Sequence, residues 1–232
     1  MTISENVAVV KENIARAAER AGRSPSEITL LAACKMNDVS RIREAFSAGI
    51  TVFGENRVQE MLEKNALEAY AGAHLHFIGH LQKNKAKQVV GLAELIHGVD
   101  SVALMQILSR LSIERGIIQE ILLEVNIGRE PSKSGFFSSE LPSALAESES
   151  LPGIRVRGLM AIPPACRNPD EIRPYFAQMQ QLFVDNREKK YDNSSMDFLS
   201  LGMSGDYALA IEYGSNLVRV GTGIFGPRSY AV

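Results

Sequence analysis

The chain has 232 residues, of which 45% are hydrophobic and 22% are charged, and its formal net charge is −2 at pH 7. These values are ordinary for a globular protein, and the small negative charge argues against a nucleic-acid binder that works through bulk electrostatics. A chain of this length buries a substantial core without disulfides, as one large domain or two small ones.

The two cysteines, Cys34 and Cys166, lie far apart and show no metal-ligand spacing, so we expect free thiols in a reducing compartment. The first six residues are polar, and the apolar run 7–10 is too short for the core of a signal peptide. No apolar run approaches the length of a membrane span. We therefore expect a cytoplasmic protein that binds neither nucleic acid nor a membrane.

Strand-like and helix-like segments alternate along the whole chain. Apolar residues at helical spacing predict an opening helix over 5–21, and Gly22 ends it. The nearly unbroken apolar run 28–34 is typical of a parallel strand buried on both faces, and Asp38 is placed to cap a helix that ends at Ala48. Further strands are predicted at 51–54, 75–79, 95–99, 121–127, 156–162, 198–202 and 217–225. Further helices are predicted at 55–71, 82–90, 101–115, 139–150, 169–189 and 207–212.

These eight strands, of which the first seven are each followed by a helix, predict a single (β/α)₈ barrel domain over 1–232. Regular alternation of this kind gives a parallel sheet with right-handed crossovers, and eight repeats suit a closed barrel. An open doubly wound sheet is the alternative. Its usual mark, a G-x-G-x-x-G turn after the first strand, is absent.

Lys35 directly follows the first predicted strand. Functional residues of a barrel gather at the C-terminal ends of its strands. A lysine there, flanked by apolar chain, would be partly desolvated, which lowers the pKa of its amine and frees the lone pair to form an imine. A surface lysine is an equally good interpretation from position alone. Cys34 should point to the opposite side of the strand and pack in the core.

Small residues cluster after the last two strands, at 202–206 and at Gly221-Thr222-Gly223. Such residues let backbone N–H groups approach an anion closely, and barrels often bind phosphate in these loops. Ordinary turn glycines are the alternative. If the barrel closes, the first and last strands become neighbours. Lys35 and these loops would then hold a phosphorylated carbonyl compound by an imine and a phosphate grip.

Five other polar residues lie in or beside predicted strands. Arg219 is inside the last strand, where its charge needs a carboxylate or a ligand as partner. Asn56 either reaches into the barrel mouth or caps the next helix, and His80 is placed to line the mouth. His74 and His76 share a strand face, but no carboxylate or cysteine completes a ligand set, so we predict no metal site.

Several motifs, in chain order, resemble those of the pyridoxal phosphate homeostasis protein family, whose barrel is similar to the N-terminal barrel of alanine racemase. The motifs are FGENRVQE (53–60), HFIGHLQKNK (76–85), GLMAIP (158–163), LGMSGD (201–206) and VRVGTGIFG (218–226). The chain keeps Lys35 but departs from the family pattern at Cys34, Met36, Arg57 and Leu75.

The resemblance implies a (β/α)₈ barrel with an extra N-terminal helix that binds pyridoxal 5′-phosphate as a Schiff base on Lys35. It implies a phosphate held around Ser204, Gly221 and Thr222, and a pyridine nitrogen that faces Arg219. Arginine only donates, so the ring nitrogen would stay unprotonated and the ring would be a poor electron sink. The residues expected to bind the cofactor are Lys35, Asn56, Met203, Ser204, Arg219, Gly221 and Thr222.

We therefore expect a monomeric, non-catalytic carrier that serves vitamin B6 homeostasis and passes the cofactor to apoenzymes that depend on it. Alanine racemase draws a tyrosine base from a second domain, and we expect this chain to lack that domain, because Val232 follows soon after the predicted barrel. One alternative is a lysine–imine enzyme, either a residual amino-acid racemase or a sugar-phosphate aldolase. Another is an interaction protein that uses the basic segment 83–87.

Overall fold

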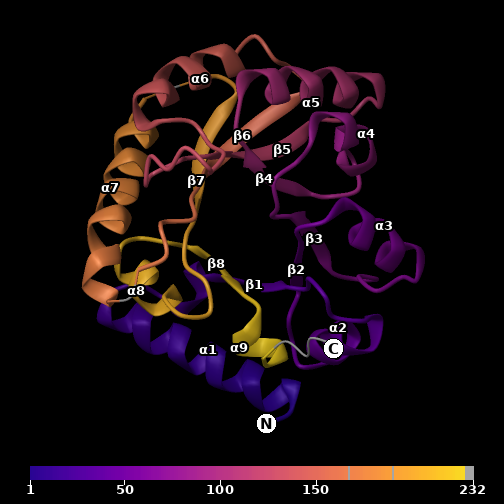
Figure 1. Ribbon diagram of the computed structural model, residues 1–232, viewed down its shortest axis with the longest axis vertical. Coiled ribbons are helices and arrows are strands. Elements are labelled where there is room, and N and C mark those ends of the chain that lie inside the picture. The colour runs from indigo at the N-terminus through magenta and orange to yellow at the C-terminus, as the bar shows by residue number, and fades with distance from the viewer. Residues whose placement is uncertain (167, 190, 228–232) are drawn as a thin grey trace.

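The computed structural model describes residues 1–166, 168–189 and 191–227. Within these ranges, parallel strands close into one barrel in the order in which they occur along the chain (Figure 1). The first strand, β1 (Thr29–Ala33), therefore pairs with the last, β8 (Leu217–Val220), and Leu31 lies opposite Arg219. The closed barrel confirms the predicted fold class. The strands between them are β2 (Val52–Glu55), β3 (His74–Phe77), β4 (Leu95–Val99), β5 (Gln119–Glu124), β6 (Ile154–Met160) and β7 (Ser194–Ser200).

Helices follow the strands and surround the barrel (Figure 1). Asp38 caps the first of them as predicted, because its side chain accepts a hydrogen bond from the Arg41 N–H. The helices are α2 (Val39–Ser47), α3 (Val58–Ala66), α4 (Ala86–Val89), α5 (Val102–Glu114), α6 (Leu141–Ser148), α7 (Pro169–Arg187), α8 (Tyr207–Glu212) and α9 (Thr222–Phe225), with 3₁₀ turns η1 (Pro25–Glu27), η2 (Lys83–Lys85) and η3 (Ser138–Glu140).

The extra helix, α1 (Ile3–Arg20), precedes the barrel and lies beside α8 and α9 (Figure 1). Thr2 and Glu5 form a capping box at its start. Asn6 Nδ2 donates a hydrogen bond to the carbonyl of Ile224, at 2.9 Å. The helix therefore braces α9, which follows β8 directly.

Most predicted boundaries differ from the structure by a few residues, and two of the differences have a clear physical reason. The strand predicted at 217–225 ends at Val220, because the backbone leaves the extended region at Gly221 and the next residues form α9. The apolar Ile224 and Phe225 are buried on this helical turn rather than on a strand. The helix predicted at 55–71 begins only at Val58, since Glu55 still belongs to β2. Arg57 occupies the N-cap position, so the interpretation of Asn56 as a cap is wrong.

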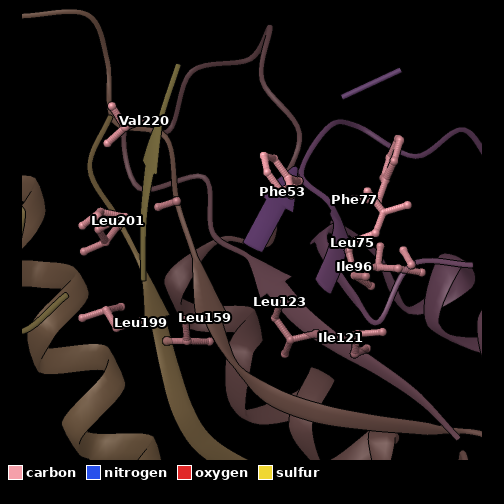
Figure 2. Packing of buried hydrophobic residues seen from close by; sticks show 14 of the residues in the cluster. Phe53, Leu75, Phe77, Ile96, Ile121, Leu123, Leu159, Leu199, Leu201 and Val220 are labelled. Carbon is pink, nitrogen blue, oxygen red and sulfur yellow. The ribbon is translucent and has the colours of Figure 1, made fainter. Parts of the chain in front are cut away.

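Alternating strand residues build two apolar layers. One cluster fills the barrel, and the other, part of which Figure 2 shows, lies between the barrel and its helices. The inner cluster consists of Leu31, Val52, Leu95, Leu122, Met160 and Leu217. The outer cluster includes Phe53, Phe77, Ile96, Ile121 and Leu123. No helix within the described ranges has the length and apolar character needed to cross a membrane.

Candidate functional site

A cavity of about 1010 Å³ opens at the C-terminal ends of the strands. Barrel closure makes β1 and β8 neighbours, so the turn after β1 and the loop after β8 both border this cavity. Its wall contains all seven residues that the sequence predicts to bind a cofactor, which are Lys35, Asn56, Met203, Ser204, Arg219, Gly221 and Thr222.

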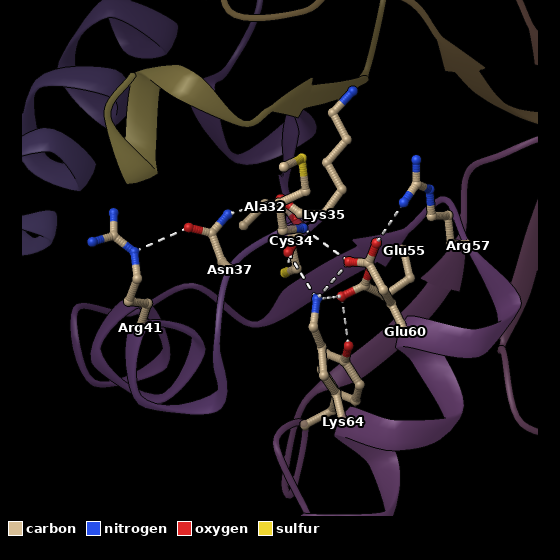
Figure 3. A network of polar contacts seen from close by, with 11 residues as sticks. Ala32, Cys34, Lys35, Asn37, Arg41, Glu55, Arg57, Glu60 and Lys64 are labelled. Atoms are coloured by element: carbon tan, nitrogen blue, oxygen red, sulfur yellow. Dashed lines mark hydrogen bonds and ion pairs between the residues drawn. The ribbon is translucent and has the colours of Figure 1, made fainter. Parts of the chain in front are cut away.

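Lys35 lies in the turn after β1, with a half-buried side chain. In Figure 3 its side chain extends away from Lys64, which lies on the other side of the turn. Asn37 Nδ2 donates a hydrogen bond to the Lys35 carbonyl, at 3.1 Å. Cys34 is buried in the outer core, and this burial raises the pKa of its thiol well above the usual value. The expected packing role of Cys34 is confirmed.

Ser204 is the centre of a small cluster of donors. Its Oγ accepts hydrogen bonds from the N–H groups of Gly221 and Gly223, each at 3.2 Å. A Cβ atom at Gly223 would lie 2.8 Å from Val220 Cγ1, so the loop is too tight for a larger residue. A serine hydroxyl has two acceptor lone pairs and one hydrogen. With both lone pairs engaged by N–H groups, the hydroxyl hydrogen is left to point toward an anion in the cavity.

Arg219 projects from β8 into the barrel and is 4% exposed. Nη1 donates to the carbonyl and Oγ of Ser200, at 2.8 and 2.5 Å, and Nη2 donates to the carbonyl of Ala161, at 3.0 Å. Burial lowers the pKa of Arg219 to about 10, although the carboxylates of Asp206 and Glu124 partly oppose the shift. The guanidinium therefore stays charged at neutral pH and is held mainly by neutral oxygens.

A buried chain of hydrogen bonds, which the sequence did not predict, continues from Arg219 across the barrel. Ser200 Oγ lies 3.2 Å from His97 Nδ1, and His97 Nε2 lies 3.0 Å from His76 Nδ1. We assign the protons from Arg219 outward, since arginine only donates: Ser200 donates to His97, and His97 donates to His76. Burial lowers the pKa of His76 to about 4 and that of His97 well below its usual value. Both rings are therefore neutral.

The opposite wall of the cavity carries ionisable groups. His80 lines the mouth as expected, with its Nδ1 3.1 Å from Asp100 Oδ2 and 3.1 Å from Ser134 Oγ. Burial first, and then the nearby Asp100 charge, raise the pKa of Glu124. Across the described ranges, no group of three or more His, Cys, Asp or Glu side chains could hold a metal ion.

Asn56 follows β2 and lines the cavity. Its Oδ1 is buried and has no hydrogen-bond partner among the described residues. A buried acceptor without a partner is costly, so this oxygen is placed for a ligand that donates a hydrogen.

The four departures from the family pattern lie in different environments. Met36 belongs to the described wall of the cavity, whereas Cys34 and Leu75 are buried in the outer core. Arg57 is exposed at the N-terminus of α3 and pairs with Glu60, at 3.6 Å. Of the four, Met36 is the one that lies in the described cavity wall.

Comparison of the sequence with known proteins first identifies the domain family to which the barrel is similar. Residues 6–229 match the family model described as alanine racemase, N-terminal domain. The pyridoxal phosphate homeostasis protein of Aquifex aeolicus is 40% identical over 230 residues, which cover 99% of this chain and 100% of that protein. The protein of the same name from Escherichia coli strain K12 is 41% identical over 235 residues, covering 99% and 98%.

Two solved structures are also similar to this chain. PipY of Synechococcus elongatus with pyridoxal phosphate bound is 33% identical and superposes with a TM-score of 0.84, covering 97% of this chain and 100% of PipY. PipY without the cofactor is 34% identical, with a TM-score of 0.86 and the same coverage. The chain belongs to the pyridoxal phosphate homeostasis protein family, as its motifs predicted.

Proposed function

We propose that this chain binds pyridoxal 5′-phosphate as a Schiff base on Lys35 and serves vitamin B6 homeostasis by buffering and delivering the cofactor. One observation carries the proposal: a lysine, a cluster of backbone donors and a buried guanidinium border a single cavity. The names of its relatives and the cofactor bound to PipY support it.

Each chemical group of this cofactor has a matching residue in the cavity. Lys35 supplies an amine for the aldehyde, and Ser204 with the N–H groups around Gly221 supplies donors for the phosphate. Arg219 supplies a fixed cation for the pyridine nitrogen, and the unpaired Oδ1 of Asn56 supplies an acceptor. Thr222 is exposed at the same loop and can reach the phosphate from the solvent side.

The electrostatics of Arg219 favour a carrier over an enzyme. When bound, pyridoxal phosphate supplies an aldehyde and a ring that accepts electrons best when its nitrogen is protonated. Arg219 is a donor that remains charged, because its pKa is about 10, so it holds that nitrogen unprotonated. The hydrogen bonds to Ser200 and Ala161 keep the guanidinium in place.

One observation keeps an enzyme as the second candidate. Glu124 lines the same cavity, and its pKa is raised toward neutral pH. A carboxyl group with a raised pKa is better suited to act as a general acid or base. A residual racemase would use such a group opposite Lys35. Measuring racemisation of alanine by the loaded protein separates the two candidates, since a carrier turns over none while it activates a pyridoxal phosphate-dependent apoenzyme by transfer.

The binding part of the proposal is tested by titrating the apoprotein with pyridoxal phosphate and following the absorbance of the imine. Lys35→Ala should lose the imine band, keep its fold and still hold some cofactor through the phosphate donors and Arg219. Lys133→Ala is the matched control, because this lysine lines the same cavity, and it should keep the band. A full imine band in Lys35→Ala would show that another lysine is the anchor.

A further inference from the structure

A buried set of charged and polar side chains supports the Lys35 turn from the side away from the cavity (Figure 3). Lys64 Nζ lies 2.7 Å from Glu55 Oε1 and 3.3 Å from Glu60 Oε2. The hydroxyl of Tyr70 donates to Glu55 Oε1, at 2.7 Å. Glu55, Glu60, Lys64 and Tyr70 are called the ion cluster below, and none of them belongs to the described wall of the cavity.

Two members of the ion cluster bind the backbone on either side of Lys35. Lys64 Nζ donates to the carbonyl of Cys34, at 3.0 Å, and Glu60 Oε2 accepts from the N–H of Met36, at 2.9 Å. Met36 has φ +60°, which is unusual for a residue with a side chain and needs surrounding contacts to hold it. The turn that carries Lys35 is therefore fixed by side chains from β2 and α3.

Stability alone does not account for the ion cluster. The side chain of Glu55 is fully buried and that of Lys64 is 11% exposed. A buried ion pair gives little net stability, because desolvation of the charges offsets their attraction. Glu55 Oε2 also lacks a hydrogen-bond partner among the described residues. A paired apolar cluster would fill this space at lower cost, but it could not bind the Cys34 carbonyl and the Met36 N–H.

We propose that the ion cluster is a positioning device, in which Lys64 and Glu60 fix the backbone around Lys35 so that its amine enters the cavity in one direction. The proposal rests on Lys35 as the cofactor anchor, which is the proposed function. Imine formation joins the Lys35 nitrogen to the aldehyde carbon, and the aldehyde oxygen leaves as water with the two amine hydrogens. The attack needs a defined approach, and a fixed backbone supplies it.

The first test replaces Glu60, which lies at the partly exposed edge of the cluster. Glu60→Ala removes the acceptor of the Met36 N–H and should slow imine formation with pyridoxal phosphate by at least about tenfold. Glu60→Gln keeps a neutral acceptor and should recover part of the rate. Glu63→Ala, on the same helix but bonded to Gln59, should react like the wild type.

Affinity for pyridoxine 5′-phosphate separates positioning from general damage. This probe carries an alcohol in place of the aldehyde, so it forms no imine but uses the same phosphate and ring contacts. Its affinity should be unchanged in Glu60→Ala. An equal loss for both ligands would show that the cluster maintains the whole cavity, and it would overturn the proposal.

A second variant replaces the two charged members of the ion cluster that are most buried. Glu55→Gln with Lys64→Met removes both charges together, so no buried charge is left unpaired. It should also slow imine formation and spare pyridoxine phosphate binding. Wild-type rates in this variant and in Glu60→Ala would refute the positioning role. Retention of the imine in Lys35→Ala would instead refute the proposed function, whatever the cluster variants show.

Discussion

Ser204 shows how one small side chain can prepare a site for an anion. Its Oγ sits where the N–H groups of Gly221 and Gly223 converge, at 3.2 Å from each nitrogen. A phosphate oxygen that binds beside it would receive the hydroxyl hydrogen and would lie close to the same backbone donors. Thr222 adds a second hydroxyl from the next turn of chain.

Removing both hydroxyls, in Ser204→Ala with Thr222→Ala, should weaken the affinity for pyridoxal phosphate by at least about tenfold. Hydrogen bonds to a charged group contribute about 1.5–3 kcal/mol each, and ~1.4 kcal/mol corresponds to a factor of ten. Backbone donors remain, so binding should not vanish. Titration with pyridoxal, which lacks the phosphate, is the control: it should bind the wild type poorly and lose little more. Equal losses of affinity for the two ligands would show that the hydroxyls stabilise the fold and do not bind the phosphate.

Between strands, the chain of buried histidines links β3 and β4 to Arg219. The unfolded chain binds a proton on His76 with a pKa near 6.5, whereas the folded chain binds it only near pH 4. Between these values the unfolded state holds more protons, so a falling pH favours unfolding. The contribution of neutral His76 to stability is therefore fully present above pH 6.5. A pKa shift of this size corresponds to a loss of unfolding free energy on the order of 3 kcal/mol by pH 4.

Chemical denaturation at a series of pH values measures this dependence. In His76→Gln the loss of unfolding free energy between pH 6.5 and pH 4 should be smaller than in the wild type. The remaining loss comes partly from His97, whose pKa is lowered in the same direction. His74→Gln is the matched control, because the His74 side chain is 60% exposed and pairs with Glu94 at the surface. The same slope in wild type and His76→Gln would contradict the buried, neutral histidine.

β6 depends on a glycine for its approach to β7. Gly158 has φ +144°, and a Cβ atom there would lie 1.9 Å from the carbonyl oxygen of Phe198. Gly158→Ala should therefore lower the free energy of unfolding by at least about 2 kcal/mol, since backbone strain and a clash with backbone both act. Gly205→Ala, where nothing lies within 4 Å of the added carbon, should stay close to the wild type. Denaturant titration of the two variants decides the point.

The periodicity of the sequence predicts elements better than it predicts contacts between them. The predicted bounds of β4 and α8 agree with the structure, because each is flanked by clear polar or glycine signals. The end of β8 was missed because an apolar run as short as 217–225 fits a strand or a helical turn equally well. Tertiary packing against α1 decides for α9.

For the molecule as a whole, closure of the barrel explains why the seven residues expected to bind the cofactor meet at one cavity. Six of them follow strand ends and Arg219 lies near the end of β8, and a closed parallel barrel brings every strand end to one mouth. The contact of His76 with His97 and the support of Lys35 by Lys64 were not predictable. The first needs the register of β3 on β4, and the second needs the position of α3 against the β1 turn.

We expect the whole chain to act as a monomer, since one barrel supplies every group that the proposed function uses. Sedimentation equilibrium of the loaded protein should give a mass near that of a single chain, 25.4 kDa. Loss of bound cofactor on dilution, in step with dissociation of a larger species, would show that a second copy contributes to the site.

Reduction of the loaded wild-type protein with borohydride, followed by mass mapping of its peptides, identifies the lysine that anchors the cofactor. Borohydride converts an imine to a stable secondary amine, so it marks the residue that carried the aldehyde. We predict a pyridoxyl phosphate adduct on Lys35 in about one copy per chain, with Lys64 and Lys133 unmodified, since ion pairs engage both amines. An adduct confined to another lysine, or none in a protein that holds the cofactor, would contradict the assignment of Lys35 as the anchor.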